Sequence, residues 1–160
     1  MITIMLILFV VVPPQPERIQ TALHYSAVVW GHDPDEFWGL AYVESTMQVN
    51  PPRMGPKGKP WGDPPEGRRW KYCGLMQTTH YPRRPARSKA AYPPGEWLIA
   101  WPELSAFYGA IHLHGWRRWC GEELQYEGWH SGWTGCRGED GLSFTRKVMR
   151  YAKRKRAKDE

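Results

Sequence analysis

Apolar residues recur at helical spacing in four segments of the chain, and each segment predicts a helix. These segments cover residues 16–30, 34–47, 102–115 and 143–151. Gly31 follows the first segment and favours the left-handed turn that ends a helix. In the last segment we expect Phe144, Val148, Tyr151 and Ala152 to face inward. The pattern predicts a mainly α fold with little or no β-sheet.

The third segment begins with Pro102, which suits the first turn of a helix because its missing N–H needs no partner there. One side of this helix carries Leu104, Phe107, Tyr108, Ile111 and Gly115. Gly109 has no side chain and permits another part of the chain to approach closely.

The second segment has the clearest helix start. Asp33 is a good N-cap, Pro34 fits the first helical position, and Glu36 three residues after the cap can complete a capping box. The apolar side of this helix, at spacings i, i+3, i+4, i+7 and i+11, carries Phe37, Leu40, Ala41, Glu44 and Gln48. Glu44 therefore points where the apolar residues point.

A carboxylate on an apolar face is a candidate for acid catalysis. Desolvation disfavours its charged form and raises its pKa, so Glu44 can keep a proton near neutral pH. A general acid needs this property. The alternative is a tilted helix that leaves Glu44 at the edge of the apolar side, either solvated or paired with an arginine.

The chain has 160 residues, which predicts one domain with a sizeable core. Its ten Trp and eight Tyr exceed what such a core needs, and its 15 Pro and 16 Gly predict long loops. Residues 50–72 hold six prolines and four glycines and are expected to form one of these loops. Its cationic and aromatic side chains suit either a lip over a polymer groove or a solvated excursion.

The net charge and the apolar N-terminal segment both bear on the environment in which the protein works. A net charge of +6 favours a polyanionic environment such as nucleic acid, anionic lipid or bacterial cell-wall polymer. The apolar run 2–12 is too short to span a bilayer. An export signal without a basic start and a buried N-terminal segment both remain open for it.

Three cysteines leave at least one thiol outside any disulfide. Cys120 and Cys136 flank glycine-rich turns and form the candidate pair, with buried free thiols as the alternative. The spacing of cysteines and histidines contains no CxxC or HExxH pattern, so we expect no metal.

Several short motifs follow one another in an order that is typical of one enzyme family. Glu44-Ser45, Asn50-Pro51 and then Gly74-Leu75-Met76-Gln77 resemble the signature of the soluble lytic transglycosylases, lysozyme-like enzymes with an SLT domain that cleave peptidoglycan glycan strands. The third helix is similar to the family's next motif, with Ser105 where Asn is usual. Residues 129–132 resemble its Tyr-Asn-x-Gly motif, with Trp129 for Tyr and His130 for Asn. The loop between Glu44 and Gly74 is longer than is usual.

The resemblance covers about residues 17–152 and implies a lysozyme-like α-helical domain with long Pro/Gly-rich loops. The expected organisation is an apolar N-terminal segment (1–15), the transglycosylase domain (16–152) and a basic tail (153–160). Glu44 is implied as the catalytic acid and base. The implied substrate-binding residues are Ser45, Met76, Gln77, Tyr108, Trp129 and His130. Of these, Ser45 and Gln77 would orient the acid or the sugar, and no cofactor is expected.

The reaction implied by the resemblance cuts the MurNAc–GlcNAc β-1,4 bond and forms 1,6-anhydroMurNAc. One alternative is a hydrolytic lysozyme that uses a second carboxylate from Asp63, Glu66 or Asp140. Another is a non-catalytic wall-binding or structural module of a phage or secretion apparatus. The expected partners are glycan strands, with no nucleic acid and no stable membrane span. We expect a monomer in the periplasm, cell envelope or extracellular space, with a phage origin left open.

Overall fold

The computed structural model describes residues 15–48, 72–79, 95–139 and 141–160. The expectations for the apolar run 2–12, for Asn50-Pro51 and for nearly all of the loop 50–72 lie outside these residues. The same holds for the three carboxylates that a hydrolytic mechanism would use, Asp63, Glu66 and Asp140.

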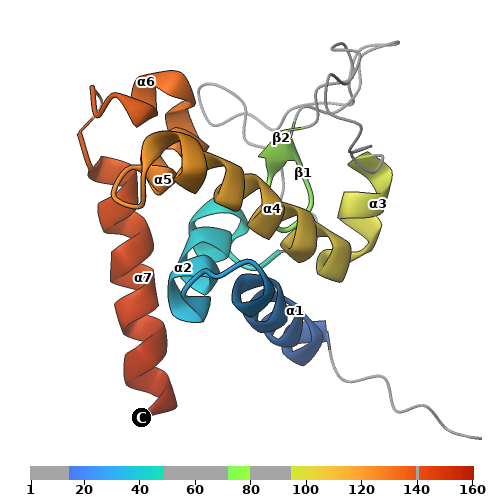
Figure 1. The fold of residues 1–160 in the computed structure, drawn as a ribbon. Coiled ribbons are helices and arrows are strands. Elements are labelled where there is room, and N and C mark those ends of the chain that lie inside the picture. Colours follow the sequence, from blue (N-terminus) through green and yellow to red (C-terminus); the bar gives the residue numbers. More distant parts are fainter. Residues whose placement is uncertain (1–14, 49–71, 80–94, 140) are drawn as a thin grey trace, which may run out of the picture.

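The described residues form a mainly α structure, which confirms the predicted fold class (Figure 1). The helices are α1 (Gln15–Val29), α2 (Pro34–Ser45), α3 (Gly95–Ala100), α4 (Pro102–Cys120), α5 (Gln125–Ser131), α6 (Trp133–Cys136) and α7 (Ser143–Asp159). Two short strands, β1 (Tyr72–Cys73) and β2 (Thr78–Thr79), pair antiparallel in a hairpin. The long apolar helices therefore define the fold, and the hairpin is a small addition to it.

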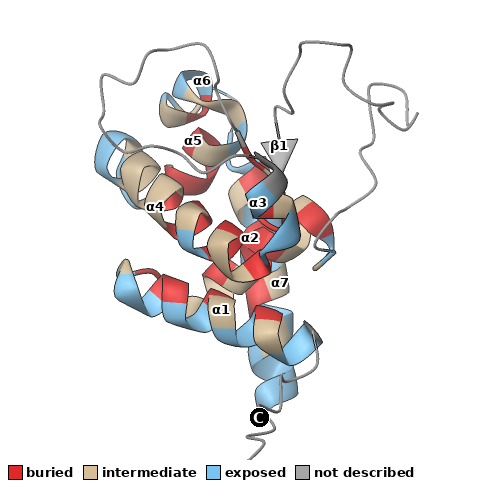
Figure 2. Ribbon diagram, turned by 90° about the vertical axis from the view of Figure 1, so that its right-hand side faces the viewer, coloured by how far each residue is buried: buried red, intermediate tan, exposed pale blue. Residues whose placement is uncertain are grey.

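Helix α2 lies in the interior of the described structure. Helix α7 packs along it, α1 crosses it, and α4 packs on α1 and leads into α5 (Figure 1). Buried residues gather on α2 and on the sides of the neighbouring helices that face inward (Figure 2). The largest of the buried apolar side chains are Leu23, Phe37, Leu40, Leu75, Met76, Leu98, Leu113, Tyr126 and Val148. This core holds the C-terminal end of α2 in a fixed place.

The helix-start signals of α2 are only partly realised. The Asp33 side chain accepts the backbone N–H groups of Asp35 and Glu36 at 2.9 and 3.0 Å, as an N-cap should. The predicted capping box is wrong, because the Glu36 carboxylate instead accepts the hydroxyl of Tyr126 at 2.8 Å. The helix ends at Ser45, where Thr46 adopts a left-handed conformation with φ +53°.

In α7 the predicted inward residues Phe144, Val148 and Ala152 are buried and Tyr151 is partly buried, and Gly31 after α1 has the expected left-handed conformation with φ +71°. Helix α4 differs. Its buried side carries Ser105, Ala106, Gly109, Ala110 and Leu113, whereas Phe107 on the expected side is 39% exposed. Small residues make this side suitable for close packing: a Cβ at Gly109 would lie 2.6 Å from the Cγ of Met76.

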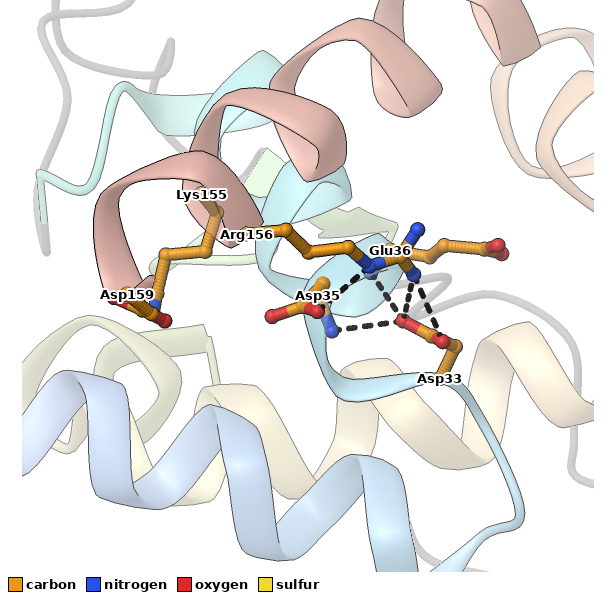
Figure 3. A network of polar contacts seen from close by, with 6 residues as sticks. All are labelled: Asp33, Asp35, Glu36, Lys155, Arg156 and Asp159. Carbon is orange, nitrogen blue, oxygen red and sulfur yellow. Dashed lines mark hydrogen bonds and ion pairs between the residues drawn. The ribbon is translucent and has the colours of Figure 1, made fainter.

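The residues expected as a separate basic tail continue α7 as far as Asp159. Within this segment Arg156 binds both acidic residues at the start of α2, with 2.9 Å from its guanidinium to Asp33 and to Asp35 (Figure 3). Lys155 pairs with Asp159 one turn further on (Figure 3). Part of the basic end therefore ties α7 to the N-terminus of α2.

A disulfide joins Cys120, at the end of α4, to Cys136, at the end of α6, which confirms the predicted pair. It fixes the α5–α6 segment against the C-terminal turn of α4. Within the described ranges, no helix combines the length and apolar character needed to cross a membrane.

Candidate active site

Glu44 lies in the last turn of α2, where it is partly buried and meets α5. The indole N–H of Trp129 donates a hydrogen bond to its carboxylate at 2.9 Å. Burial raises the pKa of Glu44 to about 7, and the Trp129 hydrogen bond lowers it by less than burial raises it. A large share of the Glu44 carboxyl groups therefore carries a proton at neutral pH, as the sequence pattern predicted.

His112 of α4 lies beside Trp129. The two rings are nearly perpendicular, with centroids 5.1 Å apart. The indole N–H of Trp116 donates to Nε2 of His112 at 3.0 Å, so the proton of the neutral imidazole sits on Nδ1. Burial lowers the pKa of His112 to about 4. A neutral His112 adds no positive charge beside Trp129. It therefore does not lower the pKa of Glu44, as a charged imidazolium would.

The turn at residues 74–77 is held by α3 and α4. Gly74 has φ +69°, and a Cβ at this position would collide with the carbonyl of Leu98. The Ser105 hydroxyl accepts the backbone N–H of Met76 at 3.1 Å. Ser105 is fully buried, so it takes part in positioning this turn although it replaces the Asn that the resemblance would imply.

Among the predicted substrate-binding residues, Trp129 donates a hydrogen bond to Glu44. Met76 was predicted to line the groove, but its side chain is fully buried against Gly109 and belongs to the core. Ser45 was predicted to orient the acid or the sugar, but its hydroxyl donates to the carbonyl of Ala41 at 2.9 Å. Both residues are buried and belong to the structure around the site.

Gln77 and His130 are also placed differently from the expectation. The Gln77 amide donates to the carbonyl of Gly74 at 2.8 Å and closes its own turn, which strains the backbone at φ +45°. The ring of His130 stacks on Phe144 of α7, with centroids 4.4 Å apart. Because neighbouring residues on a helix point about 100° apart, Trp129 and His130 serve different sides of α5.

Tyr108 lies on α4 one turn before His112 and is partly buried. Its ring meets the edge of Phe107, with centroids 5.9 Å apart. Since residues four apart share one side of a helix, Tyr108 and His112 lie on the same side of α4.

Sequence reasoning missed the polar and aromatic side of α4. Ser105, Tyr108, His112, Trp116 and Trp119 follow one another at spacings of three and four residues. This regular spacing places them on one side of the helix, and it was available in the sequence. The larger apolar residues Leu104, Phe107 and Ile111 lie on another side of this helix and dominate its hydrophobic pattern.

Glu127 of α5 is a second buried carboxylate with a different role. One of its oxygens accepts the backbone N–H groups of Phe144 and Thr145, both at 2.9 Å. Glu127 thus caps the N-terminus of α7 from another helix. Within the described part of the chain, no second carboxylate contacts Glu44, and no three His, Cys, Asp or Glu side chains converge on a metal position.

Three comparisons, with protein-family models, with curated proteins and with solved structures, found no match to this chain. The candidate site therefore stands on its own geometry. That geometry offers a carboxyl group whose pKa is raised to about 7, an indole N–H that donates to it, and a neutral imidazole in contact with the indole. Such a group can deliver a proton to a bound oxygen atom and then take one back.

Proposed function

We propose that the chain is a lytic transglycosylase of the lysozyme-like type, which cleaves the MurNAc–GlcNAc β-1,4 bond of peptidoglycan. The observation that carries the proposal is Glu44, whose pKa burial raises to about 7 at the end of a helix in the fold interior. The order of the motifs around Glu44, residues 74–77 and Trp129 adds support. A binding module has no need of an acid held near neutrality.

Within the described residues, the engagement of the other carboxylates favours this reaction over ordinary glycoside hydrolysis. Acid–nucleophile and acid–base mechanisms need two carboxyl groups that flank the scissile bond. Among the described residues, the fully buried carboxylate of Glu127 is engaged in capping α7. Glu36, on the same helix as Glu44, accepts the hydroxyl of Tyr126. A mechanism in which the substrate supplies the second group requires Glu44 alone.

In the proposed reaction, Glu44 donates its proton to the oxygen that bridges the two sugars, and the bond from that oxygen to C1 breaks. The N-acetyl group of the MurNAc ring stabilises the positive charge at C1. The 6-hydroxyl oxygen of the MurNAc ring then attacks C1, and the Glu44 carboxylate accepts the proton of this hydroxyl group. The product carries a 1,6-anhydro ring, and Glu44 has its proton again.

Trp129 has a defined part in this cycle. Its indole N–H holds one carboxylate oxygen in place and stabilises the charged form, while burial stabilises the neutral form. Glu44 acts first as an acid and then as a base. Burial and the Trp129 hydrogen bond together leave its pKa near 7, which suits both steps.

The proposed setting is the cell envelope, periplasm or extracellular space, with peptidoglycan strands as partner of a monomeric enzyme. The disulfide between Cys120 and Cys136 suits an oxidising compartment of this kind. A basic chain also suits the anionic polymers of a bacterial wall.

The test is mass spectrometry of purified peptidoglycan digested by the wild-type chain and by Glu44→Gln. We expect 1,6-anhydro ends from the wild type and no products from Glu44→Gln. Glu36→Gln is the matched control, because it changes a carboxylate on the same helix that also accepts an aromatic donor.

The outcomes separate the possible functions. Reducing ends in place of anhydro ends would identify a hydrolase and refute the transglycosylase reaction. Equal products from the wild type and Glu44→Gln would refute the role of Glu44. No products from a folded wild-type chain would point to a binding or structural module.

A further inference from the structure

The aromatic side of α4 continues past the candidate active site to a pair of exposed tryptophans. Trp116, whose N–H is fixed on His112, meets the edges of Trp119 and Trp133, with centroids 5.4 and 6.1 Å away. Trp119 and Trp133 lie against each other with centroids 5.9 Å apart and planes 30° apart. Ring contacts thus connect Trp129, which binds Glu44, to this outer pair.

The outer pair is exposed, unlike the rings that lead to it. Trp119 is 63% and Trp133 61% exposed, and both are the large apolar side chains that proteins ordinarily cover in part. Two such side chains in contact form a small apolar patch with an indole face open to solvent. A patch of this kind indicates a bound partner.

The pair is also held rigidly. Trp119 directly precedes Cys120, and Trp133 lies one turn before Cys136, so the disulfide between these cysteines links the two helices that carry the indoles. Behind them, a Cβ at Gly128 of α5 would lie 2.5 Å from the sulfur of Cys120. Close packing against α5 and the covalent link fix the relative position of the rings before any ligand arrives.

We propose that Trp119 and Trp133 form an outer section of a glycan-binding track, which binds a β-1,4-linked N-acetylhexosamine strand whose next sugars lie at Glu44. This proposal rests on the proposed function. Helix α4 rises about 1.5 Å per residue, which places Trp119 about 10 Å along its axis from His112. The outer pair is therefore within reach of the same strand that occupies the candidate active site.

The chemistry of the patch fits a sugar strand. A pyranose ring presents a face of C–H groups, which packs on the electron-rich face of an indole. The exposed area of the two indoles is on the order of 300 Å², well below the roughly 800 Å² that each protein contributes to a stable complex.

The test measures binding of N-acetylglucosamine oligomers, β-1,4-linked, by calorimetry in the full chain with Glu44→Gln to prevent turnover. We expect affinity to rise by about tenfold from the disaccharide to the tetrasaccharide, because the longer ligand reaches the tryptophan pair. Adding Trp119→Ala or Trp133→Ala should remove most of this gain, whereas Trp119→Phe should keep part of it. Trp97→Ala is the matched control, since Trp97 is 58% exposed on α3 and should not alter the gain.

Tetrasaccharide affinity that is unchanged in both alanine variants would overturn the proposal. So would sedimentation showing a wild-type dimer that Trp119→Ala disperses, because the pair would then be a contact between two copies of the chain. Thermal unfolding of each variant verifies that a loss of affinity does not reflect unfolding. Anhydro products without a length-dependent gain would refute the track and leave the proposed reaction standing. The gain without any products would support the track and refute the reaction.

Discussion

Two glutamates of the described structure, the partly buried Glu44 and the fully buried Glu127, have opposite surroundings. Glu127 receives two backbone N–H groups at the N-terminus of α7, where the helix dipole favours negative charge. Glu44 receives one indole N–H, and desolvation outweighs it and raises the pKa to about 7. The surroundings of each carboxylate thus separate the anchoring role of Glu127 from the proton transfer proposed for Glu44.

The helix ends that lie next to the two glutamates add to the difference. Glu44 stands at the C-terminal end of α2, where helix carbonyls point outward and the dipole disfavours an added negative charge. Glu127 stands opposite the first N–H groups of α7, which have no partner within their own helix. The proposed proton-transfer site thus lies at the C-terminal end of α2, and the anchoring site lies at the N-terminal end of α7.

The largest expected difference between the two glutamates is in activity. Glu44→Gln keeps the shape of the side chain but cannot deliver a proton, so turnover should fall by about 10²–10⁴-fold. Release of soluble fragments from peptidoglycan, followed per mole of folded protein, measures it. Glu127→Gln leaves Glu44 in place and is the comparison variant. More than half of wild-type activity in Glu44→Gln would exclude Glu44 as the acid.

The next largest effect is on stability. Because its folded-state pKa is above its unfolded value, Glu44 favours the folded state least when it is ionised. Glu44→Gln should therefore be more stable than the wild type by up to about 3 kcal/mol at pH 8. This advantage should shrink as pH falls below 7 and vanish below about 4.5. His112, whose pKa is lowered to about 4, contributes equally to both proteins and cancels from the difference.

Denaturant unfolding of the wild type and Glu44→Gln from pH 4 to pH 8 measures the difference in free energy of unfolding. A constant difference between the two curves would mean that Glu44 has an ordinary pKa in the folded chain. That result would remove the main support for the proposed mechanism.

Glu127→Gln should change stability in the opposite direction and by a smaller amount than Glu44→Gln. The amide oxygen can still accept the N–H groups of Phe144 and Thr145, but the amide nitrogen would be buried at an oxygen position that has no hydrogen-bond partner among the described residues. An unsatisfied buried donor and the lost charge at the helix start should destabilise the chain by about 2 kcal/mol. The same unfolding experiment at pH 8 tests it. Stabilisation in both glutamine variants would mean that the two carboxylates do not differ as described.

Periodicity sufficed where large apolar residues and the core coincide. It placed Glu44 on the inner side of α2 and Phe144 and Val148 on the inner side of α7. It failed on α4, because Ala106, Gly109 and Ala110 contribute little hydrophobicity yet allow the closest packing. The buried face of that helix follows from shape, which a hydrophobic pattern does not record.

The finer roles of polar residues depended on contacts that only folding creates. Ser45 and Gln77 bind carbonyl groups within their own helix or turn, so short-range geometry engages them before a substrate could. Glu127 reaches the start of α7 across 17 residues of chain, and its neighbours in sequence give no sign of that partner. Motif order singled out Glu44 and Trp129, which are in contact in the structure, but it did not predict the partners of Ser45, Gln77 and Glu127.

The smallest expected effect concerns the hydrogen bond that opposes burial at Glu44. Trp129→Phe removes the indole N–H and keeps an apolar ring, so the pKa of Glu44 should rise above about 7. The reaction needs Glu44 protonated at its first step, and kcat/KM should therefore fall at higher pH in the variant than in the wild type. We expect a shift of up to about one pH unit, since a single hydrogen bond contributes about 1 kcal/mol. Trp97→Phe removes an exposed indole N–H elsewhere and is the control. A shift to lower pH would mean that Trp129 does not stabilise the carboxylate, and that the contrast between one donor at Glu44 and two at Glu127 is not what separates their roles.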